Sequence, residues 1–332
     1  MAHSDQRFII GVDLGGTNIV VGAMPDDGTR HYGLRSLPTM AELGADAVVE
    51  RIAQMIRDVM DVTMAETGAT RKQFAGVGIG APGPLDRERG IVIVAPNLGW
   101  KQFPLRDRIS HAVGLPATLD NDANCATLGE WWIGAARGGR AVVGMTIGTG
   151  IGGGLVVDGR LWHGASDVAG EIGHTTIDMH GRRCKCGNYG CLEAYASGPN
   201  IAERAREQLS GDGESVLLRM AGGNLDLITA HTVYEAAHAG DRIALDVVKE
   251  TAAFLGAGVA NLLNTFNPDV VVIAGGVTQA GEALFEPLRA EARRRAFKPA
   301  YDACRIVPGE LDGAAGVVGA VATFRSQHPH VA

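Results

Sequence analysis

Four side chains that can bind a metal lie close together in the sequence: His174, Cys184, Cys186 and Cys191. One imidazole nitrogen and three thiolates form a donor set typical of closed tetrahedral zinc sites, and Gly187 and Gly190 free the loop to bring them together. The alternative is three reduced cysteines buried as small hydrophobic residues. The loop offers almost no apolar material to bury them, so we expect structural zinc. Its other residues are mostly charged or polar: Arg182, Arg183, Lys185 and Asn188.

A glycine-rich turn near the N-terminus has the composition of a phosphate site. Residues 8–24 read as strand, turn and strand, with Asp13-Leu14-Gly15-Gly16-Thr17 at the tip. Glycine amides and the Thr17 hydroxyl can approach phosphate oxygens, while Asp13 can hold a magnesium ion or its water. An ordinary Gly-Gly hairpin with a surface aspartate fits the same residues equally well.

A second strand, glycine turn and strand follow at residues 142–157, with Thr149 and Gly150 in the turn. The sequence around this turn formally matches a dinucleotide fingerprint, but a strand rather than a helix follows it, and the chain contains no Walker-type phosphate loop. The weak repeat of the two hairpins suggests two related lobes. We therefore expect two turns that hold phosphates, with Gly275-Gly276 leaving room for adenosine.

A cluster of polar side chains, Asp120-Asn121-Asp122-Ala123-Asn124, follows one strand and precedes a helix-like segment. Such residues lie at the carboxyl end of a strand, where α/β folds place ligands. A carboxylate there can act as general base for phosphoryl transfer to an alcohol. Alternatively, Asp120 or Asp122 only caps the helix.

Two glutamates, Glu171 and Glu193, flank the cysteine cluster. Carboxylates beside a sugar can accept hydrogen bonds from neighbouring hydroxyls. Taken alone, each would be an ordinary surface glutamate.

Composition narrows the class of protein. The chain has 332 residues, 46% of them hydrophobic, which suffices for two buried cores. A net charge of −7 argues against a nucleic-acid partner. Five cysteines do not make a disulfide framework, and no stretch resembles a signal peptide or a membrane span. We expect a cytoplasmic protein.

The order of elements indicates an α/β protein. A helix over residues 45–60 and a buried strand at 76–80 separate the two hairpins, and a long apolar helix at 243–263 leads into the strand at 270–274. Residues 164–198, rich in glycine, histidine and cysteine, read as loop and site.

Together these motifs resemble the ROK family of bacterial sugar kinases and repressors, within the larger actin, Hsp70 and sugar kinase fold, and most closely its glucokinases. The resemblance spans nearly the whole chain. Its most specific segments are Gly78-Ile79-Gly80-Ala81-Pro82-Gly83, Pro96-Asn97-Leu98-Gly99-Trp100, Asn121-Asp122-Ala123-Asn124, Glu171-Ile172-Gly173-His174 and the run from Cys184 to Glu193.

The resemblance implies an α/β, ribonuclease H-like fold of two duplicated lobes with a central cleft. We expect residues 8–120 plus about 312–330 in the smaller lobe, and 121–311, with the zinc loop, in the larger. It also implies ATP-dependent phosphorylation of glucose, or a related hexose, at the 6-hydroxyl by a homodimer, with a tetramer as the alternative.

The resemblance also assigns roles to individual residues. Asp122 would be the general base, with magnesium bound alongside ATP. The sugar would be held by Gly83, Asn121, Asp122, Glu171, His174 and Glu193. The nucleotide would contact Asp13, Gly15, Gly16, Thr17, Asn18, Thr149, Gly150, Gly275 and Gly276. Asn18 departs from the pattern, because many relatives have lysine there. If that lysine neutralises phosphate, its absence here would lower nucleotide affinity.

Two other classes remain as alternatives. The same family contains sugar-responsive repressors, which place a DNA-binding segment of roughly 60 to 80 residues before the sugar domain. Here Asp13 already lies in the phosphate turn, and Asp122 is retained, so we expect an enzyme. An actin-like structural protein or chaperone would have no use for the sugar and zinc residues. Fructose, mannose, allose and N-acetylhexosamines are alternative substrates.

Overall fold

A computed structural model describes residues 6–209 and 215–328 of the chain. The backbone divides into two compact units. Unit 1 comprises residues 1–138, 154–170 and 310–332, and unit 2 comprises residues 139–153 and 171–309. The lobes expected from the sequence placed a boundary after residue 120 and stay a prediction. Residues 329 and 330 of the smaller expected lobe lie outside the described residues.

Unit 1 is built on a five-stranded sheet in the order β3-β2-β1-β4-β8, with a small second sheet, β5-β6-β7. Its strands are β1 (Phe8–Leu14), β2 (Asn18–Pro25), β3 (Tyr32–Pro38), β4 (Phe74–Ala81), β5 (Leu85–Asp86), β6 (Ile91–Ala95), β7 (Trp100–Phe103), β8 (Ala117–Asn121) and β11 (Arg160–Leu161). Its helices are α1 (Ala45–Thr67), α2 (Leu105–Val113), α3 (Asp122–Trp132) and α11 (Ala315–Gln327), with short 3-10 turns η1 (Ala41–Leu43), η2 (Arg71–Gln73), η3 (Pro96–Leu98) and η7 (Asp312–Ala314).

Unit 2 contains most of the second five-stranded sheet, whose order is β11-β10-β9-β12-β13. Its strands are β9 (Ala141–Ile147), β10 (Ile151–Val157, continuing into unit 1), β12 (Val270–Ala274) and β13 (Arg305–Pro308). Its helices are α4 (Glu193–Ala196), α5 (Gly198–Leu209), α6 (Val216–Met220), α7 (Ala230–His238), α8 (Arg242–Phe266), α9 (Glu282–Arg295) and α10 (Lys298–Asp302), with 3-10 turns η4 (Ile172–His174), η5 (Leu225–Leu227) and η6 (Gly276–Ala280).

The two sheets share a strand plan, which agrees with the repeat seen in the sequence. In the first sheet β1 pairs with β2 antiparallel and with β4 parallel, and β4 pairs with β8 parallel. In the second, β9 pairs with β12 and β12 with β13, both parallel. The α/β class expected from the sequence is confirmed, and the structure adds that it contains two mixed five-stranded sheets.

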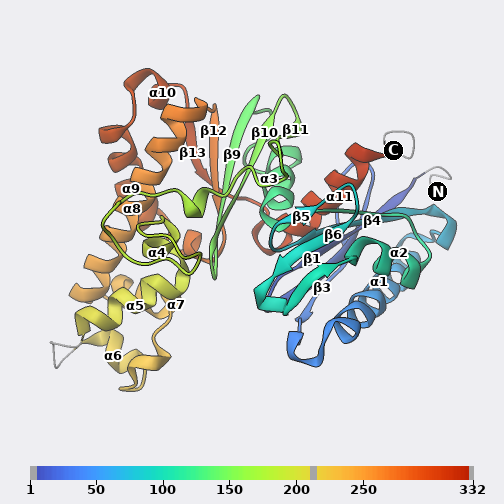
Figure 1. Cartoon of the computed structure of the whole chain (residues 1–332), viewed down its shortest axis with the longest axis horizontal. Coiled ribbons are helices and arrows are strands. Elements are labelled where there is room, and N and C mark those ends of the chain that lie inside the picture. The colour runs from blue at the N-terminus through green and yellow to red at the C-terminus, as the bar shows by residue number, and fades with distance from the viewer. Residues whose placement is uncertain (1–5, 210–214, 329–332) are drawn as a thin grey trace. The chain divides into compact units, whose positions relative to one another are not determined.

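The first sheet separates two layers of helices in unit 1. In Figure 1, α1 and α2 lie on one side of this sheet and α11 on the other. Alternation along β1 explains this, because Phe8, Ile10, Val12 and Leu14 join the core with α1 and α2, whereas Ile9 packs against α11. Asp13 has the parity of Ile9 and therefore points to the α11 face.

Glycines let α11 lie very close to its neighbours. A Cβ atom at Gly11 of β1 would be 2.2 Å from the carbonyl oxygen of Val317, and one at Gly78 of β4 would be 1.8 Å from that of Ala320. On α11 itself, a Cβ at Gly319 would be 1.5 Å from the carbonyl oxygen of Cys125 in α3. The short sequence Gly78 to Gly83 thus serves packing at its start.

Candidate active site and metal centre

The four predicted zinc ligands converge in unit 2. The nitrogen or sulfur atoms of His174, Cys184, Cys186 and Cys191 all lie within 4.8 Å of one another. The Cys186 and Cys191 sulfurs are 3.7 Å apart, and Cys184 Sγ is 3.8 Å from His174 Nδ1. Four ligands at the usual zinc bond lengths form a tetrahedron with edges of about 3.6 to 3.8 Å. The cluster therefore fits a structural zinc ion.

The loop that carries these ligands is held by more than the cluster. The buried Tyr195 hydroxyl accepts a hydrogen bond from the Arg182 amide at 2.8 Å and donates one to the Asp178 carboxylate at 3.2 Å. Its ring lies against Phe254 of α8, with ring centres 4.4 Å apart. Gly190 has a φ of +69°, and a Cβ there would be 1.6 Å from the carbonyl oxygen of Asp178. The sequence therefore folds the loop on a glycine turn and an aromatic support.

His174 presents its two ring nitrogens to different partners. Nδ1 faces the thiol of Cys184, while Nε2 lies 3.9 Å from the Glu171 carboxylate. An imidazole that binds a metal through Nδ1 carries its proton on Nε2. With a metal on Nδ1, His174 would present an N–H donor beside Glu171. The sequence predicts both His174 and Glu171 as sugar ligands.

Glu193 joins the metal loop to the second glycine turn. One carboxylate oxygen accepts a hydrogen bond from the Ile151 amide at 2.8 Å, and the other lies 3.9 Å from the sulfur of Cys184. A Cβ at Gly150 would come within 2.6 Å of the first oxygen, so a larger residue there would displace the Glu193 carboxylate. Two predicted roles, the Thr149-Gly150 phosphate turn and the sugar ligand Glu193, thus fall side by side in unit 2.

In unit 1, Asn121 and Asp122 lie where β8 meets α3. The side-chain oxygen of Asn121 accepts from the amides of Ala123 at 2.9 Å and Asn124 at 3.2 Å, so Asn121 is the helix cap. The helix cap is therefore Asn121 and not Asp120 or Asp122, although Asp122 Oδ1 also accepts a hydrogen bond from the Ala123 amide, at 2.8 Å. With its oxygen engaged, the Asn121 amide directs its NH₂ donors elsewhere. Asp122 is the first residue of α3, where the helix dipole favours a carboxylate.

Asp13 lies near the end of β1, close enough to Asp122 for the two carboxylates to repel each other. Burial raises the pKa of Asp13 to about 7, and the negative charge of Asp122 adds to the shift. Water still reaches part of the side chain. A Cβ at Gly316 would be 2.2 Å from the Asp13 carboxylate, so this glycine lets the carboxylate approach the first turn of α11. The site thus has two neighbouring carboxylates in a poorly hydrated setting.

Each glycine turn is closed by a backbone hydrogen bond, but the bond reaches three residues along the chain in the first turn and two in the second. The Gly15 amide donates to the carbonyl of Asn18 at 2.9 Å, and the Gly148 amide donates to that of Gly150 at 2.9 Å. Gly16, Thr17 and Asn18 are exposed at the tip of the first turn. In the first turn, Thr39 adds two bonds that the sequence did not suggest, from its hydroxyl to the Gly15 carbonyl and from its amide to the Thr17 carbonyl.

Two of the other predicted glycines, Gly83 and Gly275, have backbones that require glycine. Gly83 has a φ of +92°, and Gly275, at the end of β12, has a φ of +102°. A Cβ at Gly83 would be 2.1 Å from the carbonyl of Val94, and one at Gly275 would be 2.2 Å from that of Ile147. Gly276 begins η6 and has open space around it. Of these three positions, Gly276 leaves room for a ligand close to the backbone, whereas the protein's own backbone fills the space at Gly83 and Gly275.

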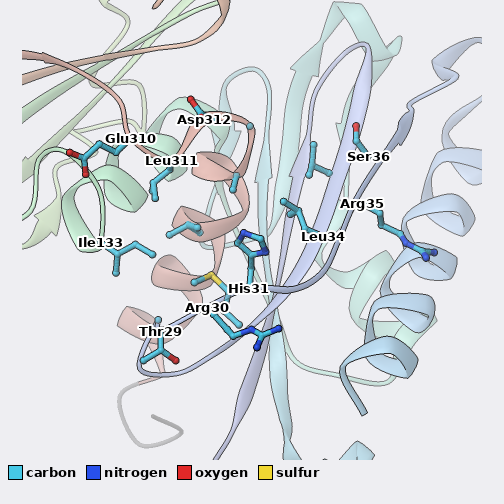
Figure 2. A pocket seen from close by; sticks show the side chains of 16 residues that line it. Thr29, Arg30, His31, Leu34, Arg35, Ser36, Ile133, Glu310, Leu311 and Asp312 are labelled. Atoms are coloured by element: carbon cyan, nitrogen blue, oxygen red, sulfur yellow. The ribbon is translucent and has the colours of Figure 1, made fainter. Parts of the chain in front are cut away.

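A cavity of about 990 Å³ lies in unit 1, but no predicted site residue lines it. Figure 2 shows it between β3, which contributes Leu34, and the segment before α11, which contributes Glu310 and Leu311. Arg30 and Asp312 also line it, so its walls carry groups of both signs. It indicates no ligand class.

The chain matches the ROK family over residues 9–327. It is 38% identical over 314 residues to a glucokinase of Halalkalibacterium halodurans, covering 94% of this chain and 93% of that protein. It is 32% identical to a xylose repressor of Caldicellulosiruptor bescii, covering 96% of this chain and 78% of the repressor. A ROK family glucokinase from Streptomyces griseus, in complex with glucose and AMPPNP, has 35% identity and a TM-score of 0.84 over 96% of this chain and 99% of that one.

The fold is that of the ROK sugar kinases, with two mixed five-stranded sheets on the actin-like plan. This chain belongs to the ROK family. Within the described ranges, no helix combines the length and the apolar character needed to cross a membrane.

Proposed function

We propose that the protein is an ATP-dependent hexose kinase that transfers the γ-phosphoryl group to the 6-hydroxyl of glucose or a close relative. The observation that carries this proposal is the neighbouring pair Asp13 and Asp122, placed at the end of β1 and the start of α3. One carboxylate can serve the sugar and the other the phosphates. The resemblance to proteins described as glucokinases supports glucose.

Asp122 would act as general base. It accepts the proton of the 6-hydroxyl as that oxygen attacks the γ-phosphorus, and the bond to the ADP oxygen breaks. Its position at a helix N-terminus favours the anionic form that this step needs. Asn121 would present its NH₂ group to a neighbouring hydroxyl, because its oxygen already caps α3.

Asp13 fits a site for magnesium. Its pKa is raised by burial and by Asp122, and a divalent cation beside it would relieve both effects. Magnesium bound with the nucleotide would supply positive charge against the phosphate oxygens. The turn at Gly15, Gly16, Thr17 and Asn18, together with Thr149 and Gly150, would hold phosphates, and Gly275 and Gly276 would lie by adenosine. Asn18 can donate a hydrogen bond but not a charge.

The metal loop would recognise the sugar. Zinc bound by His174 Nδ1 would fix the proton on Nε2, so that His174 donates to a sugar oxygen while Glu171 and Glu193 accept from hydroxyls. Gly83 would contact the sugar through its backbone. Zinc here is structural and takes no part in phosphoryl transfer. We also propose a cytoplasmic homodimer, in line with the family resemblance.

A sugar-sensing regulator is the second candidate, because the family also includes the xylose repressor of C. bescii. Both candidates would bind a sugar. They differ in turnover, since a regulator does not need a base beside a phosphate turn.

A coupled assay for ADP release tests the proposal. It is run with several phosphoryl donors and with glucose, mannose, fructose, allose and N-acetylhexosamines. We expect saturable turnover with ATP and glucose, and a hexose 6-phosphate as product. Sugar binding by calorimetry without ADP release for any sugar would favour the regulator.

A further inference from the structure

A buried carboxylate sits beside the proposed base and plays no part in the chemistry described above. Asp120 of β8 has no solvent-exposed side-chain area. Arg87 Nε donates to its Oδ2 at 2.9 Å, and His163 Nε2 lies 2.9 Å from the same oxygen. Arg87 also approaches Asp167, with 3.4 Å between Nη1 and Oδ1. All four residues belong to unit 1.

The other oxygen of Asp120 is held by the start of α3. Its Oδ1 accepts from the Asn121 amide at 2.9 Å and from the Asn124 side-chain amide at 3.1 Å. Since the carboxylate can only accept, His163 must carry a proton on Nε2. Asp120 therefore has donors from three segments, and breaking this set would leave a buried charge partly unpaired.

Two of these three segments carry the proposed sugar ligands of unit 1. Arg87 comes four residues after Gly83 and immediately after β5, and His163 follows β11. Asn121 and Asp122 come immediately after Asp120, at the turn from β8 into α3. The side chains that hold Asp120 thus tie the Gly83 loop and the segment after β11 to the residue that precedes the base.

We propose that Arg87 and His163 are positioning residues that act through Asp120 to set where Asn121 and Asp122 stand relative to the Gly83 loop. The inference rests on the proposed kinase function, for which Asp122 is the base. Both residues reach the site through the Asp120 carboxylate, so they orient the base and take no proton themselves. Their expected effect is on the chemical step and on sugar affinity, because displacement of a reacting group by about 1 Å can cost ~10²-fold in rate.

The experiment compares variants that remove each donor with variants or additives that restore it. Arg87→Ala removes the guanidinium, and His163→Leu removes the ring donor, whereas His163→Gln keeps an N–H that can reach Asp120. We expect Arg87→Ala and His163→Leu to lower kcat/KM for the sugar by about 10- to 100-fold, with the Kd of the Mg²⁺-nucleotide within about twofold. His163→Gln should recover most of the loss. Millimolar guanidinium added to Arg87→Ala should raise kcat several-fold.

Arg35→Ala is the matched control. Arg35 also pairs with an aspartate in unit 1, at 2.6 Å from Asp58, but that pair lies on α1 and β3, and its loss should leave both constants unchanged. Wild-type kcat and sugar KM in both Arg87→Ala and His163→Leu would overturn the proposal. So would a loss that His163→Gln and guanidinium both fail to reverse.

A readout that does not depend on turnover separates this proposal from the proposed function. Hydrogen exchange at the Ala123 and Asn124 amides, which the Asn121 cap protects, should accelerate in Arg87→Ala and stay unchanged in Arg35→Ala. Absence of sugar phosphorylation by the wild type would end the kinase proposal alone. Unchanged exchange in Arg87→Ala would end the positioning proposal, whatever the assay shows.

Discussion

Two regions carry the residues of the proposed function, one in each unit, and they are built by different means. In unit 1, Asp13, Asn121 and Asp122 stand at the ends of β1 and β8 and the start of α3, so regular elements aim them. In unit 2, the ligands from His174 to Cys191 lie on a loop whose only helical element is the three-residue turn η4. That loop is shaped by a metal cluster, positive-φ glycines and one tyrosine.

The two kinds of construction lead us to expect different effects of mutation on turnover and on sugar binding. A side chain at a strand end keeps its place as long as the sheet is folded, whereas a loop closed by thiolates depends on its metal. We therefore expect changes at Asp13 and Asp122 of unit 1 to act mainly on turnover, and changes in the unit 2 region to act mainly on sugar affinity and zinc content.

The largest expected effect is that of Asp122→Asn. The amide cannot take the hydroxyl proton, so kcat should fall by ~10² to 10⁴ while sugar binding stays within about tenfold. Steady-state kinetics with calorimetric sugar titration would measure both. Near-normal turnover would remove Asp122 as base. A large loss of sugar affinity would instead show that the division between the two regions is not clean.

Asp13→Asn should follow, with opposite effects on activity and stability. Loss of the carboxylate should lower kcat by about 10²-fold, because charge on the phosphates is less well offset. In the folded protein the pKa of Asp13 is about 7, above the ordinary aspartate value of 3.8. The native state therefore holds the extra proton between about pH 4 and pH 7, and its stability falls as pH rises through that window.

The Asp13→Asn variant would escape this loss of stability. In magnesium-free buffer it should unfold at a higher temperature than wild type at about pH 8, with an advantage of about 1 to 2 kcal/mol that vanishes near pH 4. This stability advantage is smaller than the free energy that the whole pKa shift of Asp13 would give, because water reaches part of the residue and screens its charge. Magnesium with nucleotide should stabilise only the wild type. If wild type and Asp13→Asn were equally stable at both pH values, the pKa of Asp13 would not be raised in the folded protein.

Cys184→Ser should act on the other region. It should reduce zinc from about one per chain and raise the sugar KM by about 10- to 100-fold, because the metal orients both His174 and Glu193. Metal analysis measures the first effect and kinetics the second. Cys304→Ser is the matched control, since Cys304 lies outside the cluster. Zinc-free protein with unaltered sugar affinity would leave the link between metal and recognition without support.

The same contrast governs what the sequence could predict. The spacing of His174 and the cysteines is local, and the hairpins follow from apolar strands around glycine turns, so both were foreseeable. The contacts of Asp120 with Arg87 and His163 could not be predicted. Arg87 and His163 lie 33 and 43 residues from Asp120, and each alone reads as a surface side chain.

The capping alternative shows a second limit of the sequence. Asp120, Asn121 and Asp122 are all good caps by residue type, and which one caps depends on where β8 ends. Here Asn121 is the cap, and Asp122 engages the helix through Oδ1, which accepts a hydrogen bond from the Ala123 amide. The neighbourhood of Glu193 and Gly150 was equally out of reach, since they are far apart in the sequence and only the fold joins them.

The smallest expected effect is that of Tyr195→Phe, and it tests how much of the unit 2 loop depends on the metal alone. The change removes the hydroxyl that joins Arg182 to Asp178 but keeps the ring against Phe254. Loss of two hydrogen bonds at a buried position should cost about 1 to 2 kcal/mol in unfolding free energy. Tyr189→Phe is the control, because Tyr189 is exposed in the same loop.

With zinc bound, Tyr195→Phe should keep its metal and raise the sugar KM only about two- to threefold, because the thiolates still hold the loop. Combined with Cys184→Ser, the same change should cost more sugar affinity than it does alone, since the tyrosine is then the main remaining support. Kinetics and metal analysis of the two single variants and the double variant measure this coupling. Strict additivity would mean that metal and tyrosine hold separate parts of the loop, and the account of unit 2 as one metal-dependent region would have to be given up.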